Sequence, residues 1–132
     1  MTETARIMPT AFEQIGGIDS VRQLVDRFYD LMDQDPRYAA LRAMHHAELA
    51  PIRASLTGFL VGWLGGPRDW FMRQDSRCVM SLHADLAVTP ATAGEWLHAM
   101  ERALQDIGVD RPLASILRQA FARMAAAMIR QA

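Results

Sequence analysis

Apolar residues recur at helical spacing along most of this chain, and glycine and proline interrupt them at sharp points. Val21, Leu24, Val25, Phe28 and Met32, for example, fall on one face of a helix with about 3.6 residues per turn. No segment of any length shows the alternation of apolar and polar residues that marks a half-buried strand. The pattern therefore predicts an all-α fold.

The breaks also predict where each helix begins and ends. Glycine stops a helix because it adopts the left-handed turn easily, and a side-chain oxygen followed by proline is typical of a helix start. In the first half of the chain we expect a short helix over 10–15 that ends at Gly16-Gly17, a helix capped by Asp19 or Ser20 that ends before Pro36, and a turn of helix over 38–44. A further helix is expected from Leu49 to Trp63, and Gly65-Gly66-Pro67 ends it. In the second half we expect a short helix over 77–84, a long one from Thr89-Pro90 to Gly108, and a last one after Asp110 and Pro112.

Size and composition fit a single domain. The chain has 132 residues, of which 51% are hydrophobic, so residues 1–132 can bury one core of their own. The formal net charge of -1 gives no electrostatic reason to expect a nucleic acid or an anionic membrane as partner. We therefore expect neither.

Cysteine usage and the N-terminal segment bear on the compartment. Cys78 is the only cysteine, which excludes an internal disulfide. The segment MTETARIM holds no apolar stretch long enough for a signal peptide, and the longest apolar run, around Gly58 to Gly66, is too short to span a bilayer. We expect a cytoplasmic protein.

A set of separated motifs resembles a known family. Gly16-Gly17, Phe28-Tyr29, the run from Phe59 to Pro67, His83 and Trp96-Leu97 together resemble the truncated haemoglobins of the second group. The separations from Pro67 to His83 and from His83 to Trp96 are those that the family uses between its glycine break, its haem-ligating histidine and its pocket tryptophan. The resemblance covers nearly the whole chain.

The resemblance implies a globin-like, truncated two-on-two helical sandwich with one haem b between the pairs of helices. His83 would be the proximal ligand of the haem iron. No CxxCH attachment motif is present, so the haem would be bound non-covalently. Arg53, Arg73 or Arg77 would meet the haem propionates. The other residues expected to line the cofactor are Phe28, Ile52, Leu56, Phe59, Val79, Leu82, Leu86 and Trp96.

Side chains on the distal side would govern ligand release. Dioxygen gains partial negative charge when it binds a ferrous haem, so hydrogen-bond donors there slow its release. Tyr29 and Trp96 are such donors, beside an apolar wall of Ile52 and Leu56. His45 falls at the corner before the distal helix. It would donate to the ligand or to Tyr29, coordinate the iron itself, or lie exposed to solvent.

Each of these residues also has a simpler interpretation. A lone histidine such as His83 is often a half-buried part of an ordinary helical core. Tyr29 and Trp96 could be core aromatics whose polar atoms bond to backbone carbonyls. His46 and His98 lie on other faces and are expected at the surface.

The function that follows is a bacterial globin that reversibly binds dioxygen, CO, NO or a similar small ligand. NO dioxygenation or peroxidase-like activity would need an unidentified reductase, because the sequence has no flavin or nicotinamide domain and no dedicated catalytic motif. The segment from Gln74 to Leu82 lacks the Gly-, Pro- and Arg-rich pattern that usually precedes the family's histidine, which leaves a haem-free globin-fold sensor or binding module as an alternative. A helical interaction protein is a further alternative, and it would leave an apolar stripe on the surface. The chain would act as a monomer or homodimer.

Overall fold

The computed structural model describes residues 10–45, 47–67, 69 and 88–129. This part of the chain is helical and contains no strand, which confirms the all-α prediction. None of its helices is long and apolar enough to cross a membrane. The elements are α1 (Ala11–Ile15), α2 (Ile18–Gln34), the 3-10 turn η2 (Pro36–Tyr38), α3 (Ala39–Ala43), α4 (Ala50–Trp63), α7 (Pro90–Asp106) and α8 (Arg111–Ala127).

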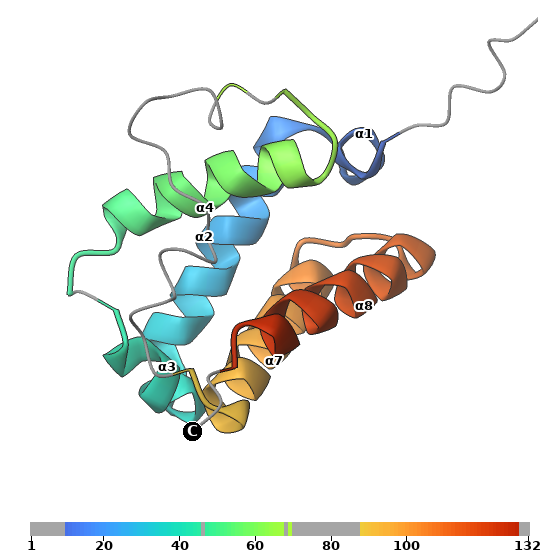
Figure 1. The fold of residues 1–132 in the computed structure, drawn as a ribbon. Coiled ribbons are helices and arrows are strands. Elements are labelled where there is room, and N and C mark those ends of the chain that lie inside the picture. The colour runs from blue at the N-terminus through green and yellow to red at the C-terminus, as the bar shows by residue number, and fades with distance from the viewer. Residues whose placement is uncertain (1–9, 46, 68, 70–87, 130–132) are drawn as a thin grey trace, which may run out of the picture.

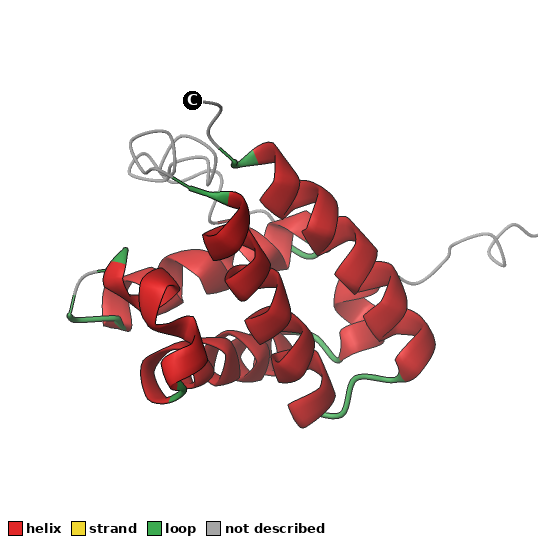
Figure 2. Cartoon of the chain, turned by 90° about the horizontal axis from the view of Figure 1, so that it is seen from below, coloured by secondary structure: helices red, strands yellow, loops and turns green. Residues whose placement is uncertain are grey.

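Four helices form two pairs that pack on each other (Figure 1). Helices α2 and α4 cross in one layer, and α7 and α8 lie side by side in the other, as the second view also shows (Figure 2). Helix α2 packs against α7, and the rings of Trp63 on α4 and Phe121 on α8 stack with centroids 5.2 Å apart. The two-on-two sandwich predicted from the sequence is confirmed.

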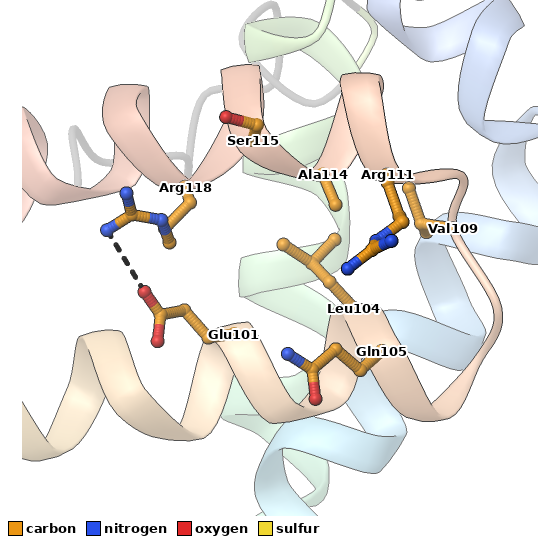
Figure 3. A pocket seen from close by; sticks show the side chains of 8 residues that line it. All are labelled: Glu101, Leu104, Gln105, Val109, Arg111, Ala114, Ser115 and Arg118. Atoms are coloured by element: carbon orange, nitrogen blue, oxygen red, sulfur yellow. Dashed lines mark hydrogen bonds and ion pairs between the residues drawn. The ribbon is translucent and has the colours of Figure 1, made fainter.

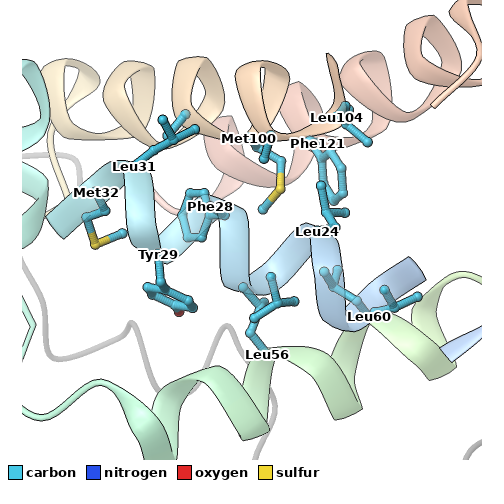
Figure 4. Close-up of a cluster of buried hydrophobic side chains, with 14 of the residues drawn as sticks. Leu24, Phe28, Tyr29, Leu31, Met32, Leu56, Leu60, Met100, Leu104 and Phe121 are labelled. Carbon is cyan, nitrogen blue, oxygen red and sulfur yellow. The ribbon is translucent and has the colours of Figure 1, made fainter. Parts of the chain in front are cut away.

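The core lies where α2 meets the other long helices (Figure 4). Leu24, Phe28, Met100 and Phe121 are completely buried there. Removing a side chain of this size from water stabilises the fold by roughly 1.5–3 kcal/mol. The stripe of apolar residues on α2 is therefore the main surface on which both layers assemble.

Most helix starts follow the expected local chemistry, with one correction. The side chains of Thr89 and Asp110 cap α7 and α8 as predicted, and the side chain of Thr10, within the expected first helix, caps α1. The prediction that Asp19 or Ser20 caps α2 is wrong, because the helix begins at Ile18 with Gly17 as its N-cap residue. Gly16 and Gly17 both have positive φ, which lets the chain turn and enter α2 before a side-chain cap is reached.

The first helix docks on the end of α4. The backbone N–H of Phe12 donates to the carbonyl of Leu64 at 2.9 Å. The ring of Phe12 lies over Gly66, where a Cβ would come within 2.7 Å of the ring. The glycine break predicted to end α4 therefore also provides the close approach that α1 needs.

We expect Gly66→Ala to destabilise the protein by about 1–3 kcal/mol, because the new methyl group would displace the Phe12 ring. Urea unfolding followed by circular dichroism measures this loss. Gly94→Ala is the matched control, since a Cβ there meets nothing within 4 Å and Gly94 lies inside α7. That change should stabilise the protein by about 0.5–1 kcal/mol. Equal effects of the two substitutions would contradict the docking argument.

Candidate functional site

Tyr29 is a buried phenol on the face of α2 that turns toward α4 (Figure 4). The residue is only 3% exposed, and its ring meets the Phe28 ring edge-on with centroids 4.8 Å apart. Its hydroxyl makes no hydrogen bond to any residue that the structure describes. Burial raises the pKa of Tyr29 above its usual value, and nearby Arg53 only partly offsets the shift. The group is therefore a protonated donor with no partner among the described residues.

Arg53 on α4 lies over the Tyr29 ring and ties α4 to α2. Its guanidinium carbon is 5.7 Å from the ring centroid. Its nitrogens donate to Asp26 at 3.1 Å and to Asp30 at 2.9 Å, both on α2. Burial works against the charge, but these two hydrogen bonds outweigh it and raise the pKa of Arg53. These hydrogen bonds and the ring contact of Arg53 are all with α2, and its predicted role at a haem propionate stays a prediction.

His45 lies beside Tyr29, just after α3. The two rings meet edge-on with centroids 5.9 Å apart. The Nδ1 atom of His45 lies 2.9 Å from the carbonyl oxygen of Leu41. A carbonyl can only accept a hydrogen bond, so Nδ1 carries a proton and donates it. The imidazole is thus half-buried against Tyr29 rather than fully exposed to solvent. The alternatives in which it donates to the ligand or to Tyr29, or coordinates the iron, stay untested.

Trp96 enters the same region from α7. Its indole meets the rings of Phe28 and Phe121 edge-on, with centroids 5.8 and 5.7 Å apart. It is only partly buried, as are Ile52 and Phe59 on α4, which pack against the core. Leu56 lies one turn after Ile52 and is buried. The residues predicted for the distal side therefore converge from three helices.

The other predicted residues lie outside the described part of the chain. They are His83, the expected proximal ligand, with Val79, Leu82 and Leu86 around it, and Arg73 and Arg77 as candidates for the propionates. The expected short helix over 77–84 lies there too. These assignments remain predictions.

Sequence reasoning missed a polar cluster between η2 and α7. The hydroxyl of Tyr38, a residue only 1% exposed, lies 2.7 Å from Nδ1 of His98. Arg102 donates to the same hydroxyl at 3.3 Å and to Asp35 at 2.7 Å. The exposed position of His98 is as expected, but its bond to Tyr38 joins residues 60 positions apart, for which the sequence carries no local signal.

A separate pocket of about 590 Å³ opens between α7 and α8 (Figure 3). Arg118 and Glu101 form an ion pair at 3.3 Å across it. None of the residues predicted to bind a cofactor lines it. Its lining residues are Glu101, Leu104, Gln105, Val109, Arg111, Ala114, Ser115 and Arg118.

The described residues fit the distal side of a haem. A haem needs an apolar slot with few donors aimed at its open face. Ile52, Phe59 and Trp96 supply partly exposed apolar surface, and Tyr29 supplies a buried hydroxyl without a partner among the described residues. Buried hydroxyls are nearly always paired, so the acceptor for this one lies outside the described residues, where a bound ligand would also lie.

Comparison with known proteins places the chain among the globins. A family model described as bacterial-like globin matches residues 10–130. A group II 2-on-2 haemoglobin from Agrobacterium tumefaciens is similar over all of both chains, with 32% identity and a TM-score of 0.88. A haemoglobin from Chloroflexus aurantiacus is 34% identical over 94% of this chain and all of its own, with a TM-score of 0.83.

A cold-adapted truncated haemoglobin from Pseudoalteromonas haloplanktis is similar over 94% of this chain and all of its own. It is 29% identical, with a TM-score of 0.88. No curated protein matches the chain.

The contrast between two buried tyrosines gives a test. Tyr38→Phe should cost about 1–3 kcal/mol of stability, because it removes the hydroxyl that bonds both His98 and Arg102. Tyr29→Phe should leave stability unchanged or raise it slightly, because its hydroxyl has no partner among the described residues. Urea unfolding of the ligand-free protein compares them. A loss at Tyr29 as large as that at Tyr38 would show that the Tyr29 hydroxyl is already paired.

Proposed function

Because the chain belongs to the bacterial-like globin family and so binds haem and dioxygen, we propose that it holds one non-covalent haem b. In this proposal His83 is the proximal ligand, and Tyr29, His45 and Trp96 form the distal side. The absence of a CxxCH motif around Cys78 supports non-covalent binding. The family match supports this proposal over the haem-free and interaction-module alternatives.

The haem, when bound, supplies a ferrous iron that takes up a diatomic ligand reversibly. The residues of this chain then decide how long the ligand stays. Phe28, Ile52, Leu56 and Phe59 form the apolar wall that keeps water out on the side of α2 and α4. Val79, Leu82 and Leu86 would do the same around His83, and Arg53 or Arg77 would face the propionates.

The buried hydroxyl of Tyr29, which has no partner in the described part of the chain, is the observation that carries the proposal. A buried hydroxyl without a partner costs roughly 1–3 kcal/mol. A ligand with partial negative charge relieves that cost by accepting the Tyr29 hydrogen bond, and the interaction is strong because the site is dry. The raised pKa of Tyr29 supports this role, since the phenol keeps its proton at any ordinary pH.

His45 and Trp96 complete the distal side. His45 donates from Nδ1 to Leu41, so a neutral ring carries no proton on Nε2 and acts there as an acceptor. In that state it orients Tyr29 through the edge contact and leaves the donation to the phenol. Trp96 has an indole N–H, which is a second donor from the opposite layer.

The proposal is limited to reversible binding of dioxygen, CO or NO. Turnover of NO or peroxide would require electrons from a separate reductase, and no contact among the described residues favours that chemistry. The family match over residues 10–130 supports one domain for the whole chain. We place this domain in the cytoplasm, as a monomer or homodimer.

His83→Ala should abolish stable haem binding, because it removes the nitrogen that bonds the iron. The absorption spectra of the ferric, dithionite-reduced and CO-treated protein, after reconstitution with haemin, measure this. His98→Ala is the matched control, since it removes a histidine from α7 that bonds Tyr38, and it should keep the Soret band. Stoichiometric haem uptake by the His83 variant, with an unchanged CO spectrum, would refute the proximal assignment.

Tyr29→Phe should speed dioxygen release by roughly 10- to 100-fold, the equivalent of one lost hydrogen bond of about 1–3 kcal/mol in a dry site. Stopped-flow mixing of the oxygenated protein with dithionite or CO gives the rate. Thr57→Val is the control, because it removes a hydroxyl on α4 that donates within its own helix, to the Arg53 carbonyl at 2.8 Å. If both variants release dioxygen at the rate of the parent protein, Tyr29 has no distal role.

A further inference from the structure

Residues 36–45, the segment that carries His45, are hydrogen-bonded to α7 at two positions. η2 and α3 lie against the first half of α7 (Figure 1). At one end of this segment Tyr38 bonds His98 at 2.7 Å and lies 3.3 Å from Arg102. At the other end the backbone N–H of Leu41 donates to Oε1 of Glu95 at 3.0 Å. The second contact adjoins the distal site.

Glu95 provides an acceptor that α3 itself lacks. The first turn of a helix has backbone N–H groups with no partner inside the helix, and a side-chain cap often satisfies one of them. Tyr38, at the N-cap position of α3, makes no such bond. The carboxylate of Glu95 reaches the Leu41 N–H from another helix instead, and a hydrogen bond to a charged acceptor is stronger than a neutral one.

The peptide groups of Leu41 connect Glu95 to His45. The N–H of Leu41 donates to Glu95, and its carbonyl accepts from Nδ1 of His45 at 2.9 Å. Holding Leu41 in place therefore fixes where the His45 ring lies and which nitrogen carries its proton. Its ring in turn meets Tyr29 edge-on at a centroid distance of 5.9 Å. A chain of contacts thus runs from α7 to the distal phenol.

We propose that Glu95 is a positioning residue, which fixes the orientation and the Nδ1–H tautomer of His45 and thereby aims the Tyr29 hydroxyl at a bound diatomic ligand. The inference rests on the proposed function, in which Tyr29 and His45 lie on the distal side. Glu95 precedes Trp96 directly in α7. Two adjacent residues of α7 therefore supply the indole of Trp96 and the carboxylate that holds His45 in place.

The test uses three variants of the haem-loaded protein. Glu95→Ala removes the acceptor. Glu95→Gln keeps an oxygen that accepts from Leu41, so it should behave like the parent protein. Glu101→Ala is the matched control, because Glu101 lies on the same helix but pairs at 3.3 Å with Arg118 on α8.

Three readouts separate positioning from mere stability. In the ferrous CO complex, nitrogen NMR of labelled histidine should show one Nδ1–H form of His45 in the parent, Glu95→Gln and Glu101→Ala proteins. Glu95→Ala should show both tautomers and more than one CO stretching band. Its dioxygen release should be roughly three- to tenfold faster, since a loosened Tyr29 loses part of one hydrogen bond.

The outcomes also separate this inference from the proposed function. If Tyr29→Phe speeds dioxygen release but Glu95→Ala leaves the tautomer and the CO band unchanged, the positioning role is wrong and the distal assignment stands. If Tyr29→Phe has no effect, the distal assignment fails, and the His45 tautomer alone decides whether Glu95 holds the ring. Equal effects of Glu95→Gln and Glu95→Ala would overturn the argument from the Leu41 bond.

Discussion

The burial of α2 between α4 and α7 is the constraint on which the rest of the molecule depends. Successive residues of a helix point about 100° apart, so Phe28 and Tyr29 cannot face the same neighbour. Phe28 turns toward α7 and is completely buried, whereas Tyr29 turns toward α4 (Figure 4). The packing that holds Phe28 in the core therefore also fixes the direction of the phenol. The packing of α2 between α4 and α7 therefore determines both the core and the position of the Tyr29 hydroxyl.

The charges around this packing act locally. Arg53 reaches from α4 to two acids on α2 and covers the Tyr29 ring, so one side chain closes the edge where the two helices cross. Exposed ion pairs contribute little on their own. Here the value of the guanidinium is that it packs over an aromatic face and fixes the spacing of two helices next to the site.

Much of the fold could be predicted because its signals are local. Thr89-Pro90 marks the start of α7 and Gly65-Gly66 follows the end of α4, and each of these signals spans only two adjacent residues. Gly17 was missed as a cap because two adjacent glycines leave the start of the next helix ambiguous. The residues of the distal side could be named only through the spacing of a whole family pattern. The bond between Leu41 and Glu95 joins residues 54 positions apart, and only tertiary packing creates it.

The cluster at Tyr38 joins η2 to α7 through one buried side chain. A guanidinium can only donate, so Arg102 donates both to the Tyr38 hydroxyl and to Asp35. The same hydroxyl lies 2.7 Å from Nδ1 of His98, one turn earlier in α7. Salt therefore weakens only part of this joint between the corner and α7, since it screens the ion pair of Arg102 with Asp35 but not the burial of the Tyr38 ring.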